Sequence, residues 1–341
     1  MKTELFDYKL PVSFIAQKPL PERDHSNLLV LDRKTGDITH DRFFNIGKYL
    51  YPGDVLVINE SKVNRCRIFG KKETTGAEIE CFVLKKAGNT DKNNEYEVLL
   101  KPSKRLKDGD RVLMGDHSFK VISKAEYGKA IVSFDCPVSE IFKSIGEMPL
   151  PPYIRGRDFE ENRYQTVYAA GGGSTAAPTA GLHFTKKLMS SLKEKKIIFA
   201  KITLDIGLDT FRPISVPDIS EHRMHSEFYH IEKSQAHLID EARKSGNKII
   251  AVGTTTVRVL ETLMQKYGKI NEDSGSTDIY IYPPFEFRIV DSMITNFHLP
   301  RSTLLVMVSA FAGRDMVMKS YEEAKEKNYR FYSFGDCMLI K

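Results

Sequence analysis

The 341-residue sequence predicts an α/β fold of two domains, in which a small β-barrel is inserted into an α/β domain. Two observations predict this class. Residues 61–147 hold short alternating apolar runs separated by turn residues, as small barrels do. The later part of the chain alternates strand runs with helical patterns, which indicates strands and helices in layers. We therefore expect a discontinuous α/β domain of residues 1–60 and 148–341, and a barrel domain of residues 61–147.

The composition excludes several classes of protein. A hydrophobic fraction of 41% and a charged fraction of 28% are ordinary for a globular chain with a sizeable core. The net charge of +6 permits an anionic partner such as RNA but does not require one. Four scattered cysteines lack any CxxC pair, which argues against a zinc ribbon and a disulfide framework. The start of the chain lacks an apolar signal region and no run is long enough to cross a bilayer, so we expect a cytoplasmic protein without a membrane partner.

The first elements lead into the barrel and form it. Residues 54–58, DVLVI, predict a buried strand. From residue 61 to residue 145 the runs IFGKK, EIECFVL, EYEVLL, RVLMG, FKVIS and AIVSFD predict short strands between Gly, Asn, Asp and Lys turns. The proline-rich segment 146–156, GEMPLPPYIRG, predicts the connection that leaves the barrel.

The remaining elements alternate between helix and strand. Thr185 is expected to cap a helix over residues 185–196. KIIAV, residues 248–252, predicts a buried strand, and residues 255–267 predict the helix that follows it. The last helices are expected over residues 302–313, capped by Ser302 after Pro300, and over residues 315–328, with a charged outer face.

Three loop-to-helix junctions share one style. AAPTAGLHFT (176–185), VGTTTVRVLET (252–262) and ITNFHLPRSTLL (294–305) each place small, hydroxyl or amide residues just before a helix. In α/β folds, loops at the carboxyl ends of strands line the ligand crevice, and helix N-termini present free N–H groups. Ordinary helix capping is the alternative for each loop alone. Together the loops predict a polar small-molecule site that contains His183, His298, Arg258 and Arg301.

The stretch TLDIGLDTFR, residues 203–212, alternates in the manner of a strand. Its apolar residues suit a core, whereas Asp205, Gly207 and Asp209 fall on the opposite face. Gly207 permits close approach to the backbone. Two like charges on one face should raise the pKa of one of them, and Arg212 can offset this effect.

Two further motifs suggest a ligand. AGGGSTAAPTAG fits neither phosphate-loop pattern, and we expect a mobile glycine-rich segment near the site. EHRMHSEFYH, residues 221–230, offers a carboxylate and imidazoles that can ligate a metal. The HxxH pair needs a helix to share one face, whereas FYHI predicts a strand, so a hydrogen-bonding or positioning role is preferred. The residues concerned are His222, His225, Glu227 and His230.

The barrel segment is rich in lysine and arginine. KPSKRLK (101–107) and RCRIFGKK (65–72) each gather four basic residues. A solvated basic face is one interpretation, and a docking surface for a phosphate backbone is the sharper one. The expected RNA-binding residues are Arg65, Arg67, Lys101, Lys104 and Arg105.

Long motifs run almost from end to end of the chain. They are FDYKLPVSFIAQKPLPERDHSNLLVLDR, GEMPLPPYI, RYQTVYA, AAPTAGLHF, TFRPI, HRMHSEFY, VGTTTVRVLE, ITNFHLPRSTLL and YRFYSFGDCMLI. In these motifs and their order the chain resembles the S-adenosylmethionine:tRNA ribosyltransferase-isomerase family of queuosine biosynthesis. The resemblance implies an α/β domain with an inserted β-barrel, which agrees with the fold predicted from the residues.

The resemblance also implies a reaction in tRNA modification. The ribosyl part of S-adenosylmethionine is transferred to the aminomethyl group of 7-aminomethyl-7-deazaguanine, a base at the tRNA wobble position. The ribosyl unit is isomerised to give epoxyqueuosine-tRNA, and adenine and methionine leave. The implied partners are this tRNA and S-adenosylmethionine as a co-substrate. No metal and no prosthetic group are implied, and we expect a monomer.

This chemistry needs proton transfers. A sulfonium acidifies the neighbouring ribose carbon, so that a base can take a proton, and the departing adenine needs a proton. Histidines suit such transfers, and we expect His183, His298 and Asp205 to be catalytic. A histidine that only braces its loop is the alternative for His183 and His298. The expected substrate-binding residues are Thr179, Gly181, Thr254, Thr255, Arg258, Asn296, Arg301 and Arg212.

The sequence departs from the family at the stretch 203–212. Asp205 and Asp209 stand where the family's TLHVGLGTF has a histidine and a glycine. A carboxylate can still act as a base or pair with the sulfonium, especially if burial raises its pKa. NESKVNRCR and GSTDIYIYPPF also differ from the usual NxTRVxPAR and GWTxxFIYPGY. Besides an active family member, two alternatives stay open: a changed acceptor, and a non-catalytic tRNA-binding protein that uses the basic barrel.

Overall fold

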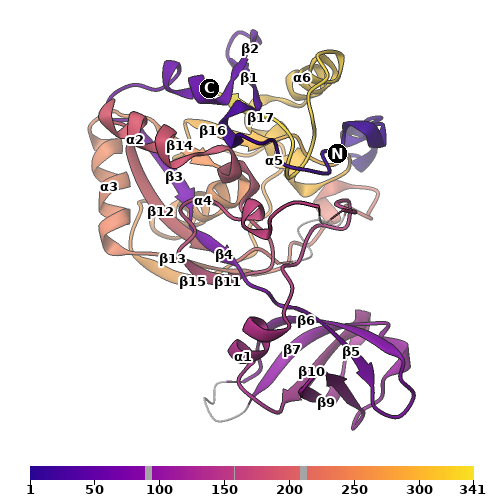
Figure 1. Cartoon of the computed structure of the whole chain (residues 1–341). Coiled ribbons are helices and arrows are strands. Elements are labelled where there is room, and N and C mark those ends of the chain that lie inside the picture. The colour runs from indigo at the N-terminus through magenta and orange to yellow at the C-terminus, as the bar shows by residue number, and fades with distance from the viewer. Residues whose placement is uncertain (89–93, 157, 208–212) are drawn as a thin grey trace. The chain divides into compact units, whose positions relative to one another are not determined.

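The computed structural model describes residues 1–88, 94–156, 158–207 and 213–341. These residues divide into two compact units: unit 1 with Met1–Lys62 and Pro151–Lys341, and unit 2 with Val63–Leu150 (Figure 1). Unit 1 combines a large sheet with helices, and unit 2 contains a closed antiparallel barrel. The predicted α/β class with a small β-barrel is therefore confirmed.

A nine-stranded sheet, counted over the described residues, forms the centre of unit 1. Its neighbouring strands β12, β3, β14 and β16 run parallel to one another. Parallel strands bring their carboxyl ends to one edge of a sheet, which is the edge where open α/β sheets bind ligands. In spatial order the strands are β15 (Asp273–Thr277), β13 (Glu227–Ile231), β12 (Ile198–Leu204), β3 (Val55–Asn59), β14 (Ile249–Val252), β16 (Ser292–Asn296), β17 (Cys337–Ile340), β1 (Asn27–Leu31) and β2 (Ile38–Arg42).

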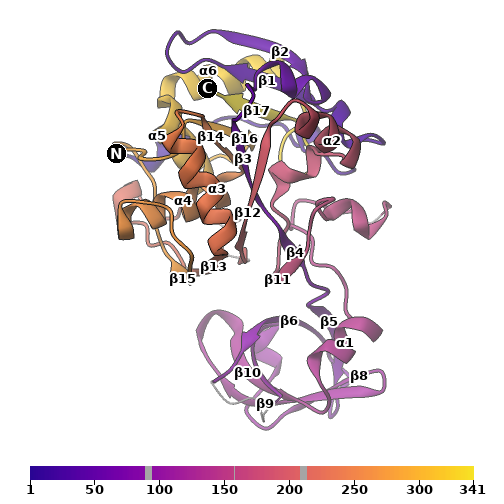
Figure 2. The same ribbon diagram turned by 90° about the vertical axis from the view of Figure 1, so that its left-hand side faces the viewer.

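Strand β3 is buried on both faces because helices cover both sides of the sheet. Val55 and Val57 join the core beneath α3 and α4, whereas Leu56 and Ile58 join the core beneath α2. Figure 2 shows α3 and α4 on one side of β3 and β12, and α2 on the other. An uninterrupted apolar run is what a parallel strand in this position requires. The helices are α2 (Lys186–Glu194), α3 (Lys233–Lys244) and α4 (Thr254–Tyr267).

The predicted helix caps are confirmed. The Thr185 hydroxyl accepts a hydrogen bond from the N–H of Leu188 at 3.1 Å, and the Ser302 hydroxyl accepts one from Leu305 at 3.1 Å. Each cap satisfies an N–H group that the first turn of a helix leaves free. None of the helices in the described ranges has the length and apolar character needed to span a membrane. The helices at the end of the chain are α5 (Thr303–Ala312) and α6 (Arg314–Glu326).

Within the predicted strand 203–212, residues 205–207 are not in a strand, because β12 ends at Leu204, and residues 208–212 lie outside the described residues. Side chains from the neighbouring strand explain this end. Asn59 and Ser61 accept hydrogen bonds from the Leu204 N–H, both at 3.1 Å, and donate to its carbonyl at 3.0 and 2.7 Å. These two side chains thus use the main-chain N–H and C=O groups of Leu204 that a neighbouring strand would otherwise pair. Asp209 and Arg212 lie outside the described residues.

The glycine-rich segment, expected to be mobile, forms the short strand β11 (Gly171–Ser174). Gly172 has a φ of +94°, and a Cβ atom at this position would approach Asp205 Oδ1 to 2.5 Å. The N–H of Gly173 donates to the same oxygen at 3.0 Å. Glycine is therefore needed here because the backbone passes directly over a carboxylate.

Unit 2 is a barrel whose described strands close into a ring of six. Side chains that alternate along the strands fill its interior, among them Val98, Leu100, Val112 and Val132. Alternation of this kind is what the short runs of the sequence predict for a small barrel. The strands follow the order β10 (Lys129–Phe134), β7 (Glu95–Lys101), β6 (Glu78–Lys86), β5 (Arg67–Lys72), β8 (Arg111–Met114) and β9 (His117–Lys124), and the helix is α1 (Val138–Ser144).

Candidate functional site

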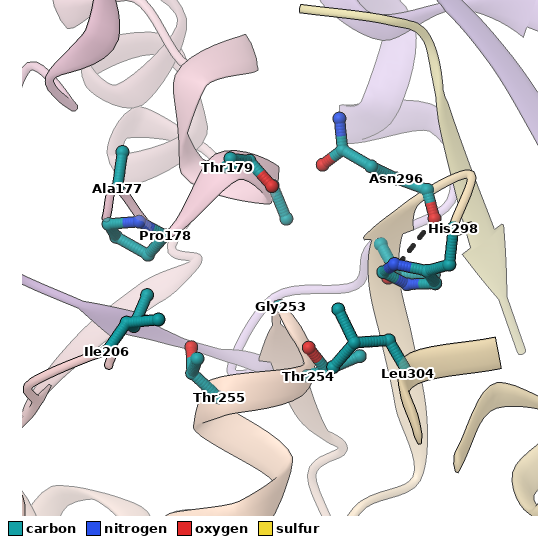
Figure 3. A pocket seen from close by; sticks show the side chains of 12 residues that line it. Ala177, Pro178, Thr179, Ile206, Gly253, Thr254, Thr255, Asn296, His298 and Leu304 are labelled. Carbon is teal, nitrogen blue, oxygen red and sulfur yellow. Dashed lines mark hydrogen bonds between the residues drawn. The ribbon is translucent and has the colours of Figure 1, made fainter. Parts of the chain in front are cut away.

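A cavity lined by apolar residues and several polar side chains lies at the carboxyl edge of the parallel strands in unit 1. It is formed by the residues after β14, the residues at the end of β16, Ile206 beyond β12, and the turn η8 (Thr179–His183). Its empty space is about 420 Å³, including the part open to solvent. Figure 3 shows residues of these segments directed toward the same space. The lining residues used below are Thr179, Ile206, Thr254, Thr255, Asn296, His298 and Leu304.

The first turn of α4 contributes N–H groups and hydroxyls. Gly253 precedes the helix with a φ of +92° and supplies no side-chain cap. The first N–H groups of a 14-residue helix are therefore not satisfied by a capping side chain. Thr254 and Thr255 line the cavity at this point. Such a terminus favours a carboxylate or a sugar hydroxyl as a ligand.

Asn296, at the end of β16, holds an unused acceptor. Its side-chain nitrogen donates to the carbonyl of Tyr332 at 3.0 Å and to His183 Nε2 at 3.3 Å. The Tyr332 carbonyl fixes the orientation of the amide, because the reversed amide would face two oxygens toward each other. Asn296 Oδ1 has no hydrogen-bond partner among the described residues and is buried. Figure 3 shows this oxygen on the side of Thr179, so a ligand with an N–H or O–H group can satisfy it.

His183 uses both ring nitrogens within the protein. Because the Asn296 amide donates to Nε2, the proton is on Nδ1, which donates to the Ser26 hydroxyl at 2.7 Å. The ring also lies 5.2 Å from that of Phe43. Burial and the charges of Arg330 and Arg23 lower the pKa of His183 to about 3. The imidazole is therefore neutral at pH 7 and does not line the cavity with His298.

His298 keeps one ring nitrogen available. Its Nε2 lies 2.7 Å from the Thr295 hydroxyl, which itself donates to the Asn296 carbonyl at 3.4 Å. The proton is therefore on Nε2, and Nδ1 carries a lone pair with no partner in the described parts of the chain. Burial lowers the pKa of His298 to about 3, so this lone pair is free at pH 7.

The backbone of His298 is held from two sides. Its N–H donates to the Tyr321 hydroxyl at 2.9 Å, and its carbonyl accepts from the Tyr8 hydroxyl at 2.5 Å. The rings of Tyr8 and Tyr321 pack edge to face with centroids 5.3 Å apart. This packing fixes the position of the imidazole before any ligand binds.

Arg258 and Arg301 do not line the cavity. Arg258 is 2% exposed and forms an ion pair with Glu227, whose other oxygen accepts from the Gly207 N–H at 2.9 Å. Arg258 therefore stabilises the backbone beyond β12 through this carboxylate. Arg301 pairs with Asp7 at 2.7 Å on the surface.

Asp205 and Gly181 lie next to the cavity rather than in its lining. Asp205 is half-buried, and burial raises the pKa of its carboxyl group. A Cβ atom at Gly181 would approach the Tyr168 hydroxyl to 2.0 Å, so this glycine permits close packing. Arg212, the remaining predicted substrate ligand, lies outside the described residues.

The residues of the EHRMHSEFYH motif do not assemble into a cluster of metal ligands in the described structure. His225 Nε2 donates to Glu227 at 3.0 Å, and His230 contacts Ser274 at 2.6 Å. The His222 ring packs on Tyr280. The strand β13 separates these side chains, which supports the hydrogen-bonding role.

The predicted tRNA-binding residues belong to unit 2. Arg65, Lys101, Lys104 and Arg105 are exposed. Arg67 is half-buried and forms ion pairs with Glu80 and Glu147, the second at 3.8 Å. The exposed four thus present more accessible positive charge than Arg67 does.

Sequence reasoning missed the residues that hold the two histidines. Ser26, Tyr8 and Tyr332 come from the two ends of the chain, far from the loops in sequence. The only available signal was their presence in the long motifs PERDHSNLL, FDYKLP and YRFYSFGD.

Comparison with known proteins gives one consistent result. A family model described as "Queuosine biosynthesis protein" matches residues 3–340. The chain is 49% identical over 344 residues to an S-adenosylmethionine:tRNA ribosyltransferase-isomerase of Thermoanaerobacter sp. (strain X514), and 48% identical to that of Staphylococcus aureus (strain JH9), with 100% of each chain covered. It is also similar to the crystal structure of an S-adenosylmethionine tRNA ribosyltransferase from Thermotoga maritima. That similarity has a TM-score of 0.58 and 39% identity, and covers 99% of this chain and 100% of the other.

Proposed function

The chain belongs to the family of queuosine biosynthesis proteins, and we propose that it is an S-adenosylmethionine:tRNA ribosyltransferase-isomerase. Its proposed reaction transfers the ribosyl part of S-adenosylmethionine to 7-aminomethyl-7-deazaguanine at the tRNA wobble position and isomerises it. The products are epoxyqueuosine-tRNA, adenine and methionine. One observation carries the proposal: the buried, unused Asn296 oxygen and the free His298 nitrogen line the same cavity.

The cavity offers complementary groups to a nucleoside-like donor. Asn296 Oδ1 can accept a hydrogen bond from an exocyclic amine, and a buried acceptor without a partner costs about 1–3 kcal/mol that such a ligand recovers. The first turn of α4, with Thr254 and Thr255, suits ribose hydroxyls or the methionine carboxylate. Ile206 and Leu304 supply apolar surface for a base or a ribose carbon.

We assign proton transfer to His298. His298 lines the cavity, its Nδ1 has no partner among the described residues, and the imidazole is neutral at pH 7. A neutral imidazole can take the acidic proton of the ribose carbon next to the sulfonium and return a proton to the departing adenine. Tyr8 and Tyr321 hold it in place for this step.

His183 receives a positioning role. Because both of its nitrogens are engaged with Ser26 and Asn296, a proton transfer would first break a buried hydrogen bond. Its effect on substrate is exerted through Asn296, whose amide it orients. Arg258 likewise acts through Glu227 on the backbone at Gly207.

The test uses the purified protein, S-adenosylmethionine and tRNA that bears 7-aminomethyl-7-deazaguanine. Mass spectrometry of the digested tRNA should show epoxyqueuosine, with adenine released in equal amount. In parallel, the melting temperature is measured with and without S-adenosylmethionine, because a ligand that binds only the folded state raises it.

Controls separate the alternatives. Asn296→Leu should remove the donor-induced rise in melting temperature, whereas Lys233→Gln on the exposed start of α3 should retain it. Binding of the donor without product would indicate a different acceptor. Salt-sensitive tRNA binding with no response to the donor would instead support a non-catalytic tRNA-binding protein.

A further inference from the structure

Three half-buried arginines converge on a second hollow of unit 1. We call it the arginine hollow; it is lined by Arg23, Arg163, Arg330, Ser26, His183 and Ser333, among others. No carboxylate occurs among the described residues that line it. Arg23 and Arg163 also line a wider outer hollow, which Lys186 and Lys187 at the start of α2 extend. The two hollows thus share two arginines, and in the outer one four basic side chains outnumber the carboxylates of Glu22 and Asp24.

The guanidinium groups are oriented by neutral partners. Their N–H groups donate to main-chain carbonyls, which fix their direction and leave their charge in place. Arg23 makes three such bonds, the shortest at 2.8 Å, and Arg330 makes one at 3.2 Å. The carbonyls are those of Gln165, Leu182 and Asn162 for Arg23, Leu20 for Arg163 and Lys18 for Arg330.

One carboxylate lies near the arginine hollow without lining it, and its oxygens already accept hydrogen bonds from neighbouring residues. Asp336 stands 4.0 Å from Arg330 Nε and is 1% exposed. It accepts hydrogen bonds from the N–H and the side chain of Asn27 and from the N–H of Arg330, at 2.8–3.0 Å. It therefore neutralises one of three guanidinium groups in part.

The arginines also disfavour one another. Burial and the charge of Arg163 lower the pKa of Arg23, and burial lowers the pKa of Arg330. In the outer hollow, Glu22 pairs with His25 at 2.7 Å and Asp24 accepts from the Thr185 hydroxyl at 2.8 Å. An anion in the arginine hollow would relieve the repulsion and use N–H groups already aimed by the backbone.

The arginine hollow adjoins the candidate site. His183 lines it and is hydrogen-bonded to Asn296, which lines the cavity of His298. Ser333 lines both the arginine hollow and the space beside His298. An anion bound in the arginine hollow would therefore be connected to a ligand in the cavity through the hydrogen bond between His183 and Asn296.

We propose that the arginine hollow binds a backbone phosphate of the RNA acceptor next to the substrate nucleotide, with Lys186 and Lys187 contacting the phosphates that follow. The proposal rests on the proposed function in taking RNA as the partner. Because Arg23 and Arg163 line both hollows and the outer hollow adds Lys186 and Lys187, the arrangement favours a chain of phosphates over a single small anion. The residues that contact tRNA would then include those of unit 1 as well as the exposed lysines and arginines of the barrel.

The test measures binding of a fluorescently labelled, unmodified anticodon stem–loop RNA by anisotropy, without S-adenosylmethionine, over a range of KCl concentrations. Arg163→Gln and Arg330→Gln should each weaken binding about tenfold at moderate salt, because each loses a charged contact. The slope of log K against log[KCl] should fall in magnitude by about 0.7–0.9 for each lost phosphate contact. Lys233→Gln, exposed on α3, is the matched control and should change neither value.

A second pair of variants guards against misfolding. Lys186→Gln and Lys187→Gln alter exposed side chains at a helix start, where a positive charge is unfavourable, so they should fold. They should reduce the salt slope in the same way. Unchanged RNA affinity and salt slope in all four variants would overturn the proposal.

The other anions give distinct results. If the arginine variants lost the melting-temperature rise caused by S-adenosylmethionine and kept full RNA affinity, the hollow would bind the donor carboxylate and the proposal would be wrong. If 10 mM inorganic phosphate, rather than RNA, were the ligand that the variants lost, a free anion site would be indicated instead. Because the RNA assay needs no donor and no turnover, its result is independent of whether the proposed reaction occurs.

Discussion

Two loops of unit 1 each carry a buried histidine, and they differ in what the rings are free to do. His183 on η8 and His298 after β16 are both nearly inaccessible, and burial lowers both pKa values to about 3. His183 is hydrogen-bonded through both nitrogens, whereas His298 lines the cavity and its Nδ1 has no partner among the described residues. Burial and a shifted pKa therefore do not identify the reacting group, and the pattern of satisfied nitrogens does.

The largest expected effect is on turnover at His298. His298→Ala should lower the rate of adenine release by about 10²–10⁴-fold, because a positioned general base typically contributes that much. The Tyr321 and Tyr8 bonds go to the backbone of residue 298 and survive the change, so the protein should fold. Single-turnover adenine release with the modified tRNA measures the effect. A rate within threefold of the unchanged protein would remove His298 from proton transfer and end the distinction drawn between the two loops.

The second effect is on stability against pH, and it should be equal for the two histidines. Their pKa values in the folded chain, about 3, lie below the ordinary value near 6.5, so the unfolded chain binds protons first. Stability is then fully present above pH 6.5 and is lost as the pH falls toward 3. At pH 5 each histidine should cost about 2 kcal/mol of unfolding free energy relative to pH 7.5. Urea unfolding at the two pH values measures this loss.

Single variants show which histidines cause the loss of unfolding free energy at low pH. His298→Gln should reduce the loss between pH 7.5 and pH 5 by one histidine's share, and His237→Gln on the exposed face of α3 should leave it intact. An equal loss in all three proteins would show that other groups cause it.

A smaller effect should distinguish His183 from His298, because a change beside His183 should affect stability more than turnover. Ser26→Ala leaves the buried Nδ1–H of His183 without an acceptor, which should lower the unfolding free energy by about 1–3 kcal/mol at pH 7.5. Its effect on turnover should be weaker than that of His298→Ala and should fall mainly on KM, since Asn296 loses its fixed orientation. Steady-state kinetics and urea unfolding measure both quantities. A pH profile of kcat displaced by Ser26→Ala would instead indicate that His183 itself transfers a proton.

Much of unit 1 was predictable because local signals decide it. The runs VLVI (55–58) and IIAV (249–252) are apolar throughout because parallel strands are covered on both faces. Thr185 and Ser302 cap the helices that follow them. The barrel class followed from alternation of apolar residues. The three loops that line the cavity were found because they lie after strands or before helices, where the topology places ligands.

The features that the sequence did not reveal have a common physical cause. Leu204 ends β12 because side chains about 145 positions away, at Asn59 and Ser61, take its hydrogen bonds. Arg258 on α4 is predicted to bind substrate, and in the structure it pairs with Glu227 of β13, a partner that the sequence did not indicate. Partners this distant in sequence leave no local pattern, so a single sequence predicts which residues are polar and buried but not which of them satisfy one another.

The smallest expected effect concerns Asp205, at the border between the cavity and β11. Burial raises the pKa of its carboxyl group, so the folded chain binds this proton before the unfolded chain does, and its contribution to stability increases as the pH falls. This sign is opposite to that of the two histidines. Asp205→Asn keeps an acceptor for the Gly173 N–H and removes the buried charge, so the unfolding free energy at pH 7.5 should change by less than about 1 kcal/mol, and turnover by less than about threefold. Urea unfolding and adenine release at pH 7.5 measure the two effects. A loss of turnover comparable to that of His298→Ala, with stability intact, would place a second proton-transferring group at this border, and Asp205→His would then be expected to restore the rate.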